Sequence, residues 1–414
     1  MSGSGVSGKD ADTGPVAAID LRRRFLLELG ADLLSGGLPV PDIEQMLRTI
    51  GSVLGADDVM VAATPTGLFV TMGHDASTGF HPVGPGLRFE QTAAVLDVMH
   101  AVRRRTVPYP AALERLQTIR HRPARWPAWL SDLGALPIGV GLCLLLQPAL
   151  ANVLVAAVAS LMVAGVTAAA RRWPSVRPLV PVAAAFSVSI VVLLATRASL
   201  MDGPLRTIVA VLAVLLPGSL LVTGLSEIAA GALQAGTARL TAGVAQLVLF
   251  LAGVLAAVAV TDAPATVLNN TAVAHHGVWA IALGLTIAIA GIIVNVYVPL
   301  RAIAPIAAVV AVTATVQLSV QHFYGPGLGG LAGAVVAAAA AAVAHRLPNG
   351  PSWQVAYLPA FWVLVPGSFG LLNTAGLGSG TDTHAILTAV FAVVGVSVGT
   401  LIGAPFGRLG LRNA

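Results

Sequence analysis

Apolar stretches long enough to cross a lipid bilayer follow one another along the chain after Trp129. A helix needs about 20 predominantly apolar residues to span the hydrocarbon core. Ten stretches come close to this length, near residues 130–146, 150–170, 178–196, 205–223, 239–260, 278–297, 300–320, 327–345, 353–372 and 385–405. The sequence therefore predicts a polytopic α-helical membrane protein with ten transmembrane helices, because helices satisfy their backbone hydrogen bonds without water.

The acidic residues divide the 414-residue chain into a polar head and an apolar body. Hydrophobic residues make up 56% of the chain and charged residues only 10%, with a mean hydropathy of +0.85. Of the 18 acidic residues, 13 nevertheless precede Trp129. We expect a disordered tail over 1–18 and a small cytoplasmic α+β domain over 19–128 that ends in a basic juxtamembrane segment.

Local patterns within the head predict the elements of this α+β domain. Periodicity predicts helices near 20–34, 41–54, 88–105 and 110–120, and strands near 58–64 and 68–72. A basic collar then precedes Trp126 and Trp129; it comprises Arg103, Arg104, Arg105, Arg120, Arg122 and Arg125. We expect this collar to contact anionic lipid headgroups.

The arginines of the body indicate how the chain crosses the membrane. Eight lie on one side in the ten-helix arrangement: Arg171, Arg172, Arg177, Arg239, Arg301, Arg346, Arg408 and Arg412. Only Arg197 and Arg206 lie on the other side. Because cytoplasmic loops are enriched in Arg and Lys, both termini are predicted to be cytoplasmic. Arg in place of Lys, with abundant Ala, Gly and Val, is typical of a GC-rich bacterial genome, so we expect a bacterial cytoplasmic membrane.

Two nearly identical strings, LPGS at 216–219 and VPGS at 365–368, lie 149 residues apart (366 − 217). The same shift brings the first five predicted helices onto the second five, with the fifth slightly late. Because five is odd, the second copy crosses the membrane in the opposite sense. The sequence thus predicts a 5+5 inverted repeat over 129–262 and 277–406, a recurring design of secondary transporters. Each proline removes a backbone hydrogen bond and interrupts its helix.

Several motifs occur in an order that resembles a known family. They are LLSGGLPV at 33–40, TPTG at 64–67, LLPGS at 215–219 and TGLSE at 223–227. In this order they resemble the bacterial threonine/serine exporter family, with both of its membrane units fused in one chain. The resemblance covers about residues 20–405 and implies export of small amino acids. Some related systems export dicarboxylates such as succinate, which leaves that substrate class open.

The two Pro-Gly breaks are the predicted substrate site. A carrier for a zwitterion has to hold a carboxylate and an ammonium away from bulk water. Free N–H groups at a helix N-terminus suit the carboxylate, and hydroxyls or freed carbonyls suit the ammonium. The predicted binding residues are Pro217, Gly218, Ser219, Thr223, Pro366, Gly367, Ser368 and Asn373. Alternatively, Pro-Gly only kinks a packed helix whose hydroxyls bond their own backbone.

Glu227 is the acid nearest to either break, and the second copy has Gly376 in its place. A carboxylate within a membrane protein is costly and usually functional. We therefore expect Glu227 to couple transport to protons, although an ordinary acid facing a loop would also fit its place near a helix end.

The remaining sequence favours ion-driven transport over other classes. No phosphate-binding loop, CxxC pair or Ser-His-Asp arrangement occurs, so we expect no enzyme activity, cofactor, metal or nucleic-acid partner. We expect a secondary active transporter that exports its substrate and is driven by the proton gradient. A passive channel gated by the cytoplasmic domain is the competing class. Glycines in the stretch 327–345 would permit close helix packing within a homo-oligomer.

Overall fold

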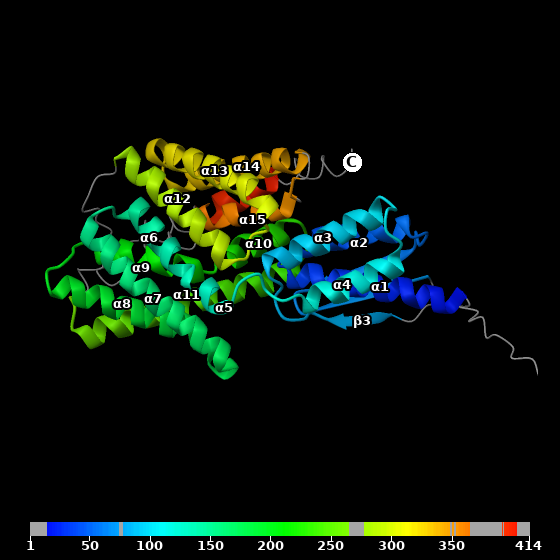
Figure 1. Cartoon of the computed structure of the whole chain (residues 1–414), viewed down its shortest axis with the longest axis horizontal. Helices are drawn as coiled ribbons and strands as arrows, with labels where there is room; N and C mark the ends of the chain where they lie inside the picture. Colours follow the sequence, from blue (N-terminus) through cyan, green and yellow to red (C-terminus); the bar gives the residue numbers. More distant parts are fainter. Residues whose placement is uncertain are drawn as a thin grey trace, which may run out of the picture. The chain divides into compact units, whose positions relative to one another are not determined.

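The computed structural model describes residues 15–73, 78–264, 277–347, 350–351, 353–364, 391 and 393–403 (Figure 1). The chain divides into two compact units. The head unit comprises Met1–Leu87 and Ala94–Arg122, and the membrane unit comprises Arg88–Ala93 and Pro123–Ala414.

The helices and strands predicted for the first 121 residues are confirmed. They are α1 (Pro15–Ser35), α2 (Val40–Val53), β1 (Val59–Thr64), β2 (Gly67–Met72), α3 (Phe89–Arg103) and α4 (Tyr109–His121). A third strand, β3 (Gly79–Pro82), was not predicted and extends the antiparallel sheet in the order β1-β2-β3. β3 is only four residues long, which is too short for a sequence pattern to identify it.

The core of the head unit follows from the alternation of β2. Leu68, Val70 and Met72 are buried, as expected where one face of a strand packs on a core. Helix α1 packs on β2 and β3, and α2 packs on β1. The hairpin register pairs Thr64 with Gly67, and the Thr64 hydroxyl accepts a hydrogen bond of 3.1 Å from the Gly67 N–H.

The membrane unit consists of helices. They are α5 (Ala128–Leu133), α6 (Ala135–Leu146), α7 (Leu150–Arg172), α8 (Val180–Arg197), α9 (Pro204–Leu212), α10 (Gly218–Ala229), α11 (Leu233–Thr261), α12 (Val278–Asn295), α13 (Ile303–Tyr324), α14 (Pro326–Arg346), α15 (Trp353–Leu364) and a last described helix, Val393–Gly403. Short 3-10 turns precede three of them, at Pro174–Leu179, Ala213–Leu215 and Leu300–Ala302.

Length and apolarity qualify six helical runs among the described residues as membrane spans, and a bent pair, Pro204–Leu215 with Gly218–Ala229, gives a seventh. Two shorter apolar helices, Trp279–Asn295 and Val393–Gly403, fall below that length. A described helix lies at each of the ten predicted positions, but the number ten stays a prediction. The chain is a multi-pass helical membrane protein.

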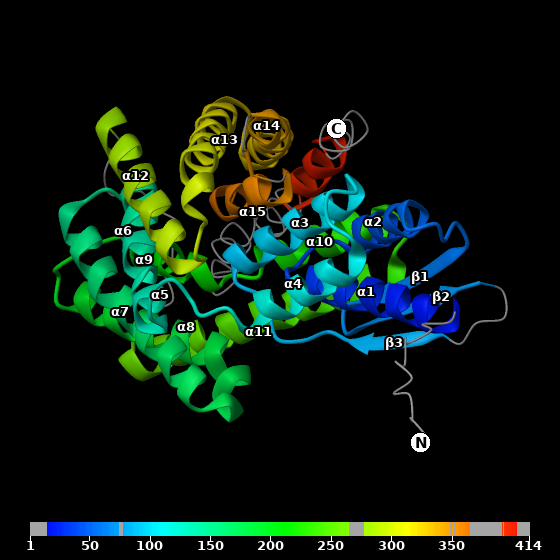
Figure 2. The same ribbon diagram turned by 45° about the vertical axis from the view of Figure 1, so that its right-hand side comes forward.

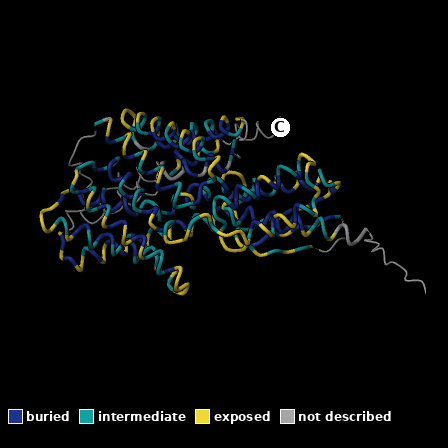
Figure 3. The backbone as a smooth tube through the Cα atoms, in the orientation of Figure 1, coloured by how far each residue is buried: buried dark blue, intermediate teal, exposed yellow. Residues whose placement is uncertain are grey.

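The outward faces of these helices are apolar, as lipid contact requires. On α7, Leu150, Leu154 and Val158 follow one another at helical spacing and are 74%, 59% and 53% exposed. Figure 3 shows the exposed positions of the membrane unit alternating with buried ones along its helices. A stripe of exposed leucine and valine would be unfavourable in water and is ordinary in a bilayer.

Glycines bring α6 and α12 into backbone contact (Figure 2). A Cβ on Gly284 would lie 2.7 Å from the Gly141 carbonyl oxygen, and one on Gly291 would lie 2.9 Å from the Gly134 carbonyl oxygen. Small residues are the usual means by which membrane helices approach so closely. The pairing runs antiparallel, because the earlier glycine of one helix meets the later glycine of the other.

The same helix pairs pack in both halves of the membrane unit. Helix α7 packs on α8 and α9, and α8 packs on α9; correspondingly, α13 packs on α14 and α15, and α14 packs on α15. Helix α11 packs on α8, and the last described helix lies against α14, where a Cβ on Gly399 would come within 2.5 Å of the Leu331 carbonyl oxygen.

Candidate functional site

The first predicted break is a sharp bend. Helix α9 ends at Leu212, a single 3-10 turn follows, and Leu216 is extended with φ −66° and ψ 139°. Helix α10 then starts at Gly218, and the two segments meet at 64°. The cause is local, because Pro217 lacks the N–H that would continue the ladder. The interruption at Pro217 agrees with the prediction, but the predicted end of this helix at 223 is wrong, because its second part continues to Ala229.

Polar residues of α10 lead away from this break along one side of the helix. Ser219, Thr223 and Glu227 follow one another at four-residue spacing, which places them on neighbouring turns. Ser219 is exposed, Thr223 is half-buried and Glu227 is fully buried. The nearby Ser226 hydroxyl donates to the Thr223 carbonyl 2.9 Å away. The Ser226 hydroxyl is therefore hydrogen-bonded within its own helix. The row of Ser219, Thr223 and Glu227 runs from the break to a buried carboxylate.

Glu227 forms an ion pair with Arg239 of α11. The Glu227 Oε2 and Arg239 Nε atoms are 3.1 Å apart, and the two side chains are 0% and 13% exposed. The alternative of a loop-facing acid is wrong, because α10 and α11 form a tight hairpin that covers the carboxylate. Gly224 and Gly236 permit this, since a Cβ on Gly236 would lie 2.6 Å from the Gly224 carbonyl oxygen.

The sequence pattern placed Arg239 in a cytoplasmic loop and did not identify it as a site residue. Helix α11 instead begins at Leu233 and contains Arg239 in its second turn. The available signal was an acid and an arginine on either side of a short Ala-Gly-Ala turn in an otherwise apolar segment. Such a turn brings the two side chains together whenever both flanks are helical.

A glutamine from another helix bonds the backbone just before each Pro-Gly string. The Gln246 side chain of α11 donates from Nε2 to the Leu215 carbonyl oxygen at 2.9 Å. In the second half, Gln317 of α13 donates from Nε2 to the Leu364 carbonyl oxygen at 3.1 Å. Leu364 lies 149 positions after Leu215, the spacing of the two Pro-Gly strings. Each of these amides therefore joins two neighbouring helices.

The second break itself is not described. Pro366, Gly367, Ser368 and Asn373 lie outside the described residues, as does Gly376. Helix α15 is described as far as Leu364, where it packs on α13 and α14 and also contacts α10. The half-helix of the first break thus touches the helix that leads to the second.

Arg125 of the predicted basic collar and the adjacent Trp126 join helices of the membrane unit. The Arg125 guanidinium donates to the Val298 carbonyl oxygen at 3.1 Å, and the Trp126 indole N–H donates to that of Val294 at 3.0 Å. Trp126 also stacks on Tyr297 with ring centroids 5.2 Å apart. These contacts tie the start of the first predicted span to the end of α12, so both residues pack on protein.

Arg120, also assigned to the collar, instead belongs to a buried cluster in the head unit. Its Nε lies 2.6 Å from Asp32 Oδ1, and its Nη1 lies 3.7 Å from Glu28 Oε2. Burial raises the pKa of Asp32 to about 6, and this effect outweighs the opposing effect of Arg120. Arg120 is thus engaged by carboxylates of its own unit, and contact of the collar with lipid stays a prediction.

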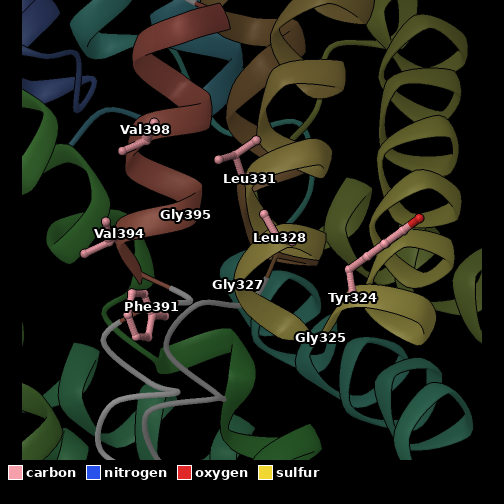
Figure 4. Close-up of a pocket in the computed structure, with 9 residues that line it drawn as sticks. All are labelled: Tyr324, Gly325, Gly327, Leu328, Leu331, Phe391, Val394, Gly395 and Val398. Carbon is pink, nitrogen blue, oxygen red and sulfur yellow. The ribbon is translucent and has the colours of Figure 1, made fainter.

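The described residues hold few other candidates for a polar ligand. They contain no group of three His, Cys, Asp or Glu side chains with a metal-binding arrangement. A cavity of about 490 Å³ lies between the start of α14 and the last described helix (Figure 4). Leu328, Leu331, Phe391, Val394 and Val398 line it, with glycines and Tyr324. This lining offers no charged group to an amino acid.

Comparison with known proteins identifies the family. A profile of the ThrE threonine/serine exporter family matches residues 24–261, more than half of the chain, and the match ends at the last residue of α11. No curated protein and no solved structure matches the chain. The four motifs noted in the sequence all lie within the matched region. The chain belongs to the threonine/serine exporter family.

Proposed function

We propose that this chain is a secondary active transporter that exports small amino acids of the threonine/serine type from the cytoplasm and exchanges them for protons. The observation that carries the proposal is the bent helix at Pro217, which leads along α10 to the buried pair of Glu227 and Arg239. Membership of the exporter family supports the transport class and the type of substrate.

The start of α10 suits the carboxylate of the substrate. No side chain caps this helix among the described residues, and its N-cap is Pro217. The first N–H groups of a helix point outward and carry partial positive charge, which favours an anion. The Ser219 hydroxyl lies in the first turn and the Thr223 hydroxyl one turn later, and both can donate to a polar group of the substrate. Pro366, Gly367, Ser368 and Asn373 would complete the site from the second repeat.

The pair of Glu227 and Arg239 is suited to couple proton movement to a change of conformation. A buried carboxylate stays ionised in a membrane only beside a compensating charge. Protonation of Glu227 removes the charge attraction that joins α10 to α11. The contact between α10 and α11 therefore weakens when Glu227 binds a proton and strengthens when the proton leaves. The position of α10 is thereby linked to the proton gradient.

Glycine contacts support the proposed 5+5 inverted repeat. Gly284 and Gly291 follow Gly134 and Gly141 by 150 positions each, close to the spacing of the Pro-Gly strings. Gly134 meets Gly291 and Gly141 meets Gly284. A two-fold axis produces this reciprocity, in which residue i contacts j′ and residue j contacts i′. An axis in the membrane plane would relate the two antiparallel helices, as in other inverted-repeat transporters.

The arginine distribution supports cytoplasmic termini, with the head domain of 19–128 on the cytoplasmic side of a bacterial cytoplasmic membrane. We propose that this domain supports or gates the membrane unit. Counterflow by a variant that lacks residues 1–125 separates the two roles, because a gate changes the flux of a transporter that still assembles.

The test is transport by the purified chain in proteoliposomes. We expect counterflow of labelled threonine or serine and uphill flux driven by a pH gradient. Glu227→Gln should abolish the gradient-driven flux, and Asp262→Asn serves as its control because Asp262 is an exposed acid at the end of α11 with φ 49°, a conformation that asparagine tolerates. Absence of counterflow would overturn the proposed function, and unchanged gradient-driven flux in the Glu227 variant would remove that residue from coupling.

A further inference from the structure

Two glutamines of α13 carry buried carbonyl oxygens without a hydrogen-bond partner. Gln317 is 4% exposed, and its Oε1 atom accepts no hydrogen bond within the structure that is described. Gln321 lies one turn further along the same side of the helix, and its Oε1 atom is also buried and accepts no hydrogen bond in the described structure. Buried amide oxygens normally have partners, so two unsatisfied ones on adjacent turns require an explanation.

The orientation of the Gln317 amide is fixed by its own donor. Its Nε2 donates to the Leu364 carbonyl oxygen at 3.1 Å, which an amide flipped by 180° could not do. The oxygen therefore faces away from Leu364. The Gln317 Oε1 atom is therefore a hydrogen-bond acceptor with a fixed orientation beside the second break.

Glycines of α14 make room for both glutamines. A Cβ on Gly329 would lie 2.7 Å from Gln321 Cβ, and one on Gly333 would lie 3.0 Å from Gln317 Cβ and 2.6 Å from Leu364 Cδ2. Helices α13, α14 and α15 pack on one another, and α13 and α14 lie side by side in both views (Figures 1 and 2). Both side chains thus lie at the contact between α13 and α14, and Gln317 also adjoins Leu364 of α15, the helix that precedes the second break.

The chemistry of the pair selects a hydrogen-bond donor. Amide oxygens only accept, so they repel a carboxylate and suit a group rich in N–H or O–H donors. An ammonium offers three donors and binds neutral acceptors by charge-assisted hydrogen bonds. A dicarboxylate has no group that could occupy this place.

We propose that the Gln317 and Gln321 side-chain oxygens bind the ammonium group of a zwitterionic small amino acid in the second half of the transporter. This inference rests on the proposed transport function and names the part of the substrate that this half recognises. It also selects amino acids over the dicarboxylates that the sequence left open.

The test is competition against counterflow of labelled threonine in proteoliposomes. Threonine methyl ester keeps the ammonium and should inhibit, whereas N-acetylthreonine and succinate should not. Gln321→Leu should raise the KM for threonine by about tenfold or more, the effect of losing a charge-assisted hydrogen bond, and leave the maximal rate and stimulation by a pH gradient unchanged. Gln321→Glu retains an acceptor and should keep the KM near or below that of the unchanged protein.

Thr315→Val provides a matched control on α13, because Thr315 is exposed and its hydroxyl donates to the Ala311 carbonyl at 2.8 Å. Its KM should not change. Equal KM values for the unchanged protein and both Gln321→Leu and Gln317→Leu would show that the oxygens hold only water and would overturn the inference, as would inhibition by N-acetylthreonine. In either case counterflow by the unchanged protein would leave the proposed function standing.

Discussion

The residues just before the two Pro-Gly strings make the same kind of backbone contact, and the side chains nearby differ in chemistry. At each, a glutamine from another helix donates to a carbonyl, that of Leu215 or of Leu364, and these two positions are 149 residues apart. The first break leads to the ionised pair of Glu227 and Arg239. The second adjoins the neutral oxygens of Gln317 and Gln321. A similar scaffold thus carries a titratable group in one half and neutral acceptors in the other.

This difference fits the two tasks of an exchanger. A coupling group has to change charge, and the cost of a charge within a membrane makes its protonation sensitive to its surroundings. A group that holds a substrate should keep the same charge throughout the cycle. If the halves divide the tasks in this way, changes at the first break alter coupling and changes at the second alter affinity.

The largest expected effect comes from removing one partner of the ion pair. Arg239→Met leaves the Glu227 carboxylate buried without compensation and should lower the free energy of unfolding by about 3–5 kcal/mol. The double variant Glu227→Gln, Arg239→Met should recover most of this loss, yet remain unable to use a pH gradient. Thermal unfolding in detergent measures the recovery. If the double variant is as unstable as the single one, the unpaired Glu227 carboxylate is not the cause of the lost stability.

Asp32, a buried acid of the head unit, gives the protein a pH dependence of its own. This dependence has to be distinguished from one that arises at the first break. The pKa of Asp32 is raised from 3.8 to about 6, so the folded state holds a proton that the unfolded chain has lost between these values. Stability of the head unit should therefore fall as pH rises from about 4 to about 6, by about 3 kcal/mol in total, and change little above that.

Asp32→Asn should remove this slope, and hydrogen exchange of the α1 amides in the full chain is the measurement. The variant should also leave the dependence of transport on a pH gradient intact. A loss of that dependence would place the coupling group in the head unit and would refute the role of the first break.

The glutamines test whether the two breaks are equivalent in structure. Gln246→Leu should cost about 1–3 kcal/mol, because the Leu215 carbonyl loses its donor. Gln317→Leu should cost less, since it deprives the Leu364 carbonyl of a donor but also removes an unsatisfied oxygen. Chemical denaturation compares the two variants. An equal or larger cost for Gln317→Leu would mean that its oxygen is already satisfied.

The smallest effects concern the glycine contacts that support the repeat. Gly134→Ala and Gly284→Ala occupy related positions, and each added methyl meets backbone or Cβ atoms within 3 Å. Both substitutions should lower the free energy of unfolding by similar amounts, about 1–2 kcal/mol each. Gly165→Ala on α7 is the control, because a Cβ there meets nothing within 4 Å and should stabilise the helix by about 0.5–1 kcal/mol. Clearly unequal costs at the first two positions would count against the two-fold axis.

The sequence predicted those features that depend on local patterns. Apolar length located the helices, alternation located β1 and β2, and the missing N–H of Pro217 located the break. The sequence-based prediction ended the broken helix at 223, because the following Gly-Leu-Ser-Glu-Ile-Ala-Ala-Gly segment combines small and polar residues that are typical of loops. Packing of Gly224 against Gly236 keeps this segment helical.

The partners of the charged and amide side chains could not be predicted in the same way. The pairing of Glu227 with Arg239 depends on the register of a hairpin, and Gly231 at its turn adopts φ 88°, a conformation open to glycine. Arg120 joins Asp32 only because α4 packs on α1, 88 residues earlier in the chain. Contacts of this kind follow from tertiary packing, which periodicity along one helix does not specify.

The division of tasks between the halves is tested most directly by comparing Glu227→Gln with Gln321→Leu under one assay. Efflux of labelled threonine from proteoliposomes is measured over a range of internal threonine concentrations, with and without a pH gradient. We expect Glu227→Gln to lose stimulation by the gradient, and Gln321→Leu to keep full stimulation with a KM raised about tenfold. Loss of stimulation in Gln321→Leu, or full stimulation in Glu227→Gln, would contradict the account.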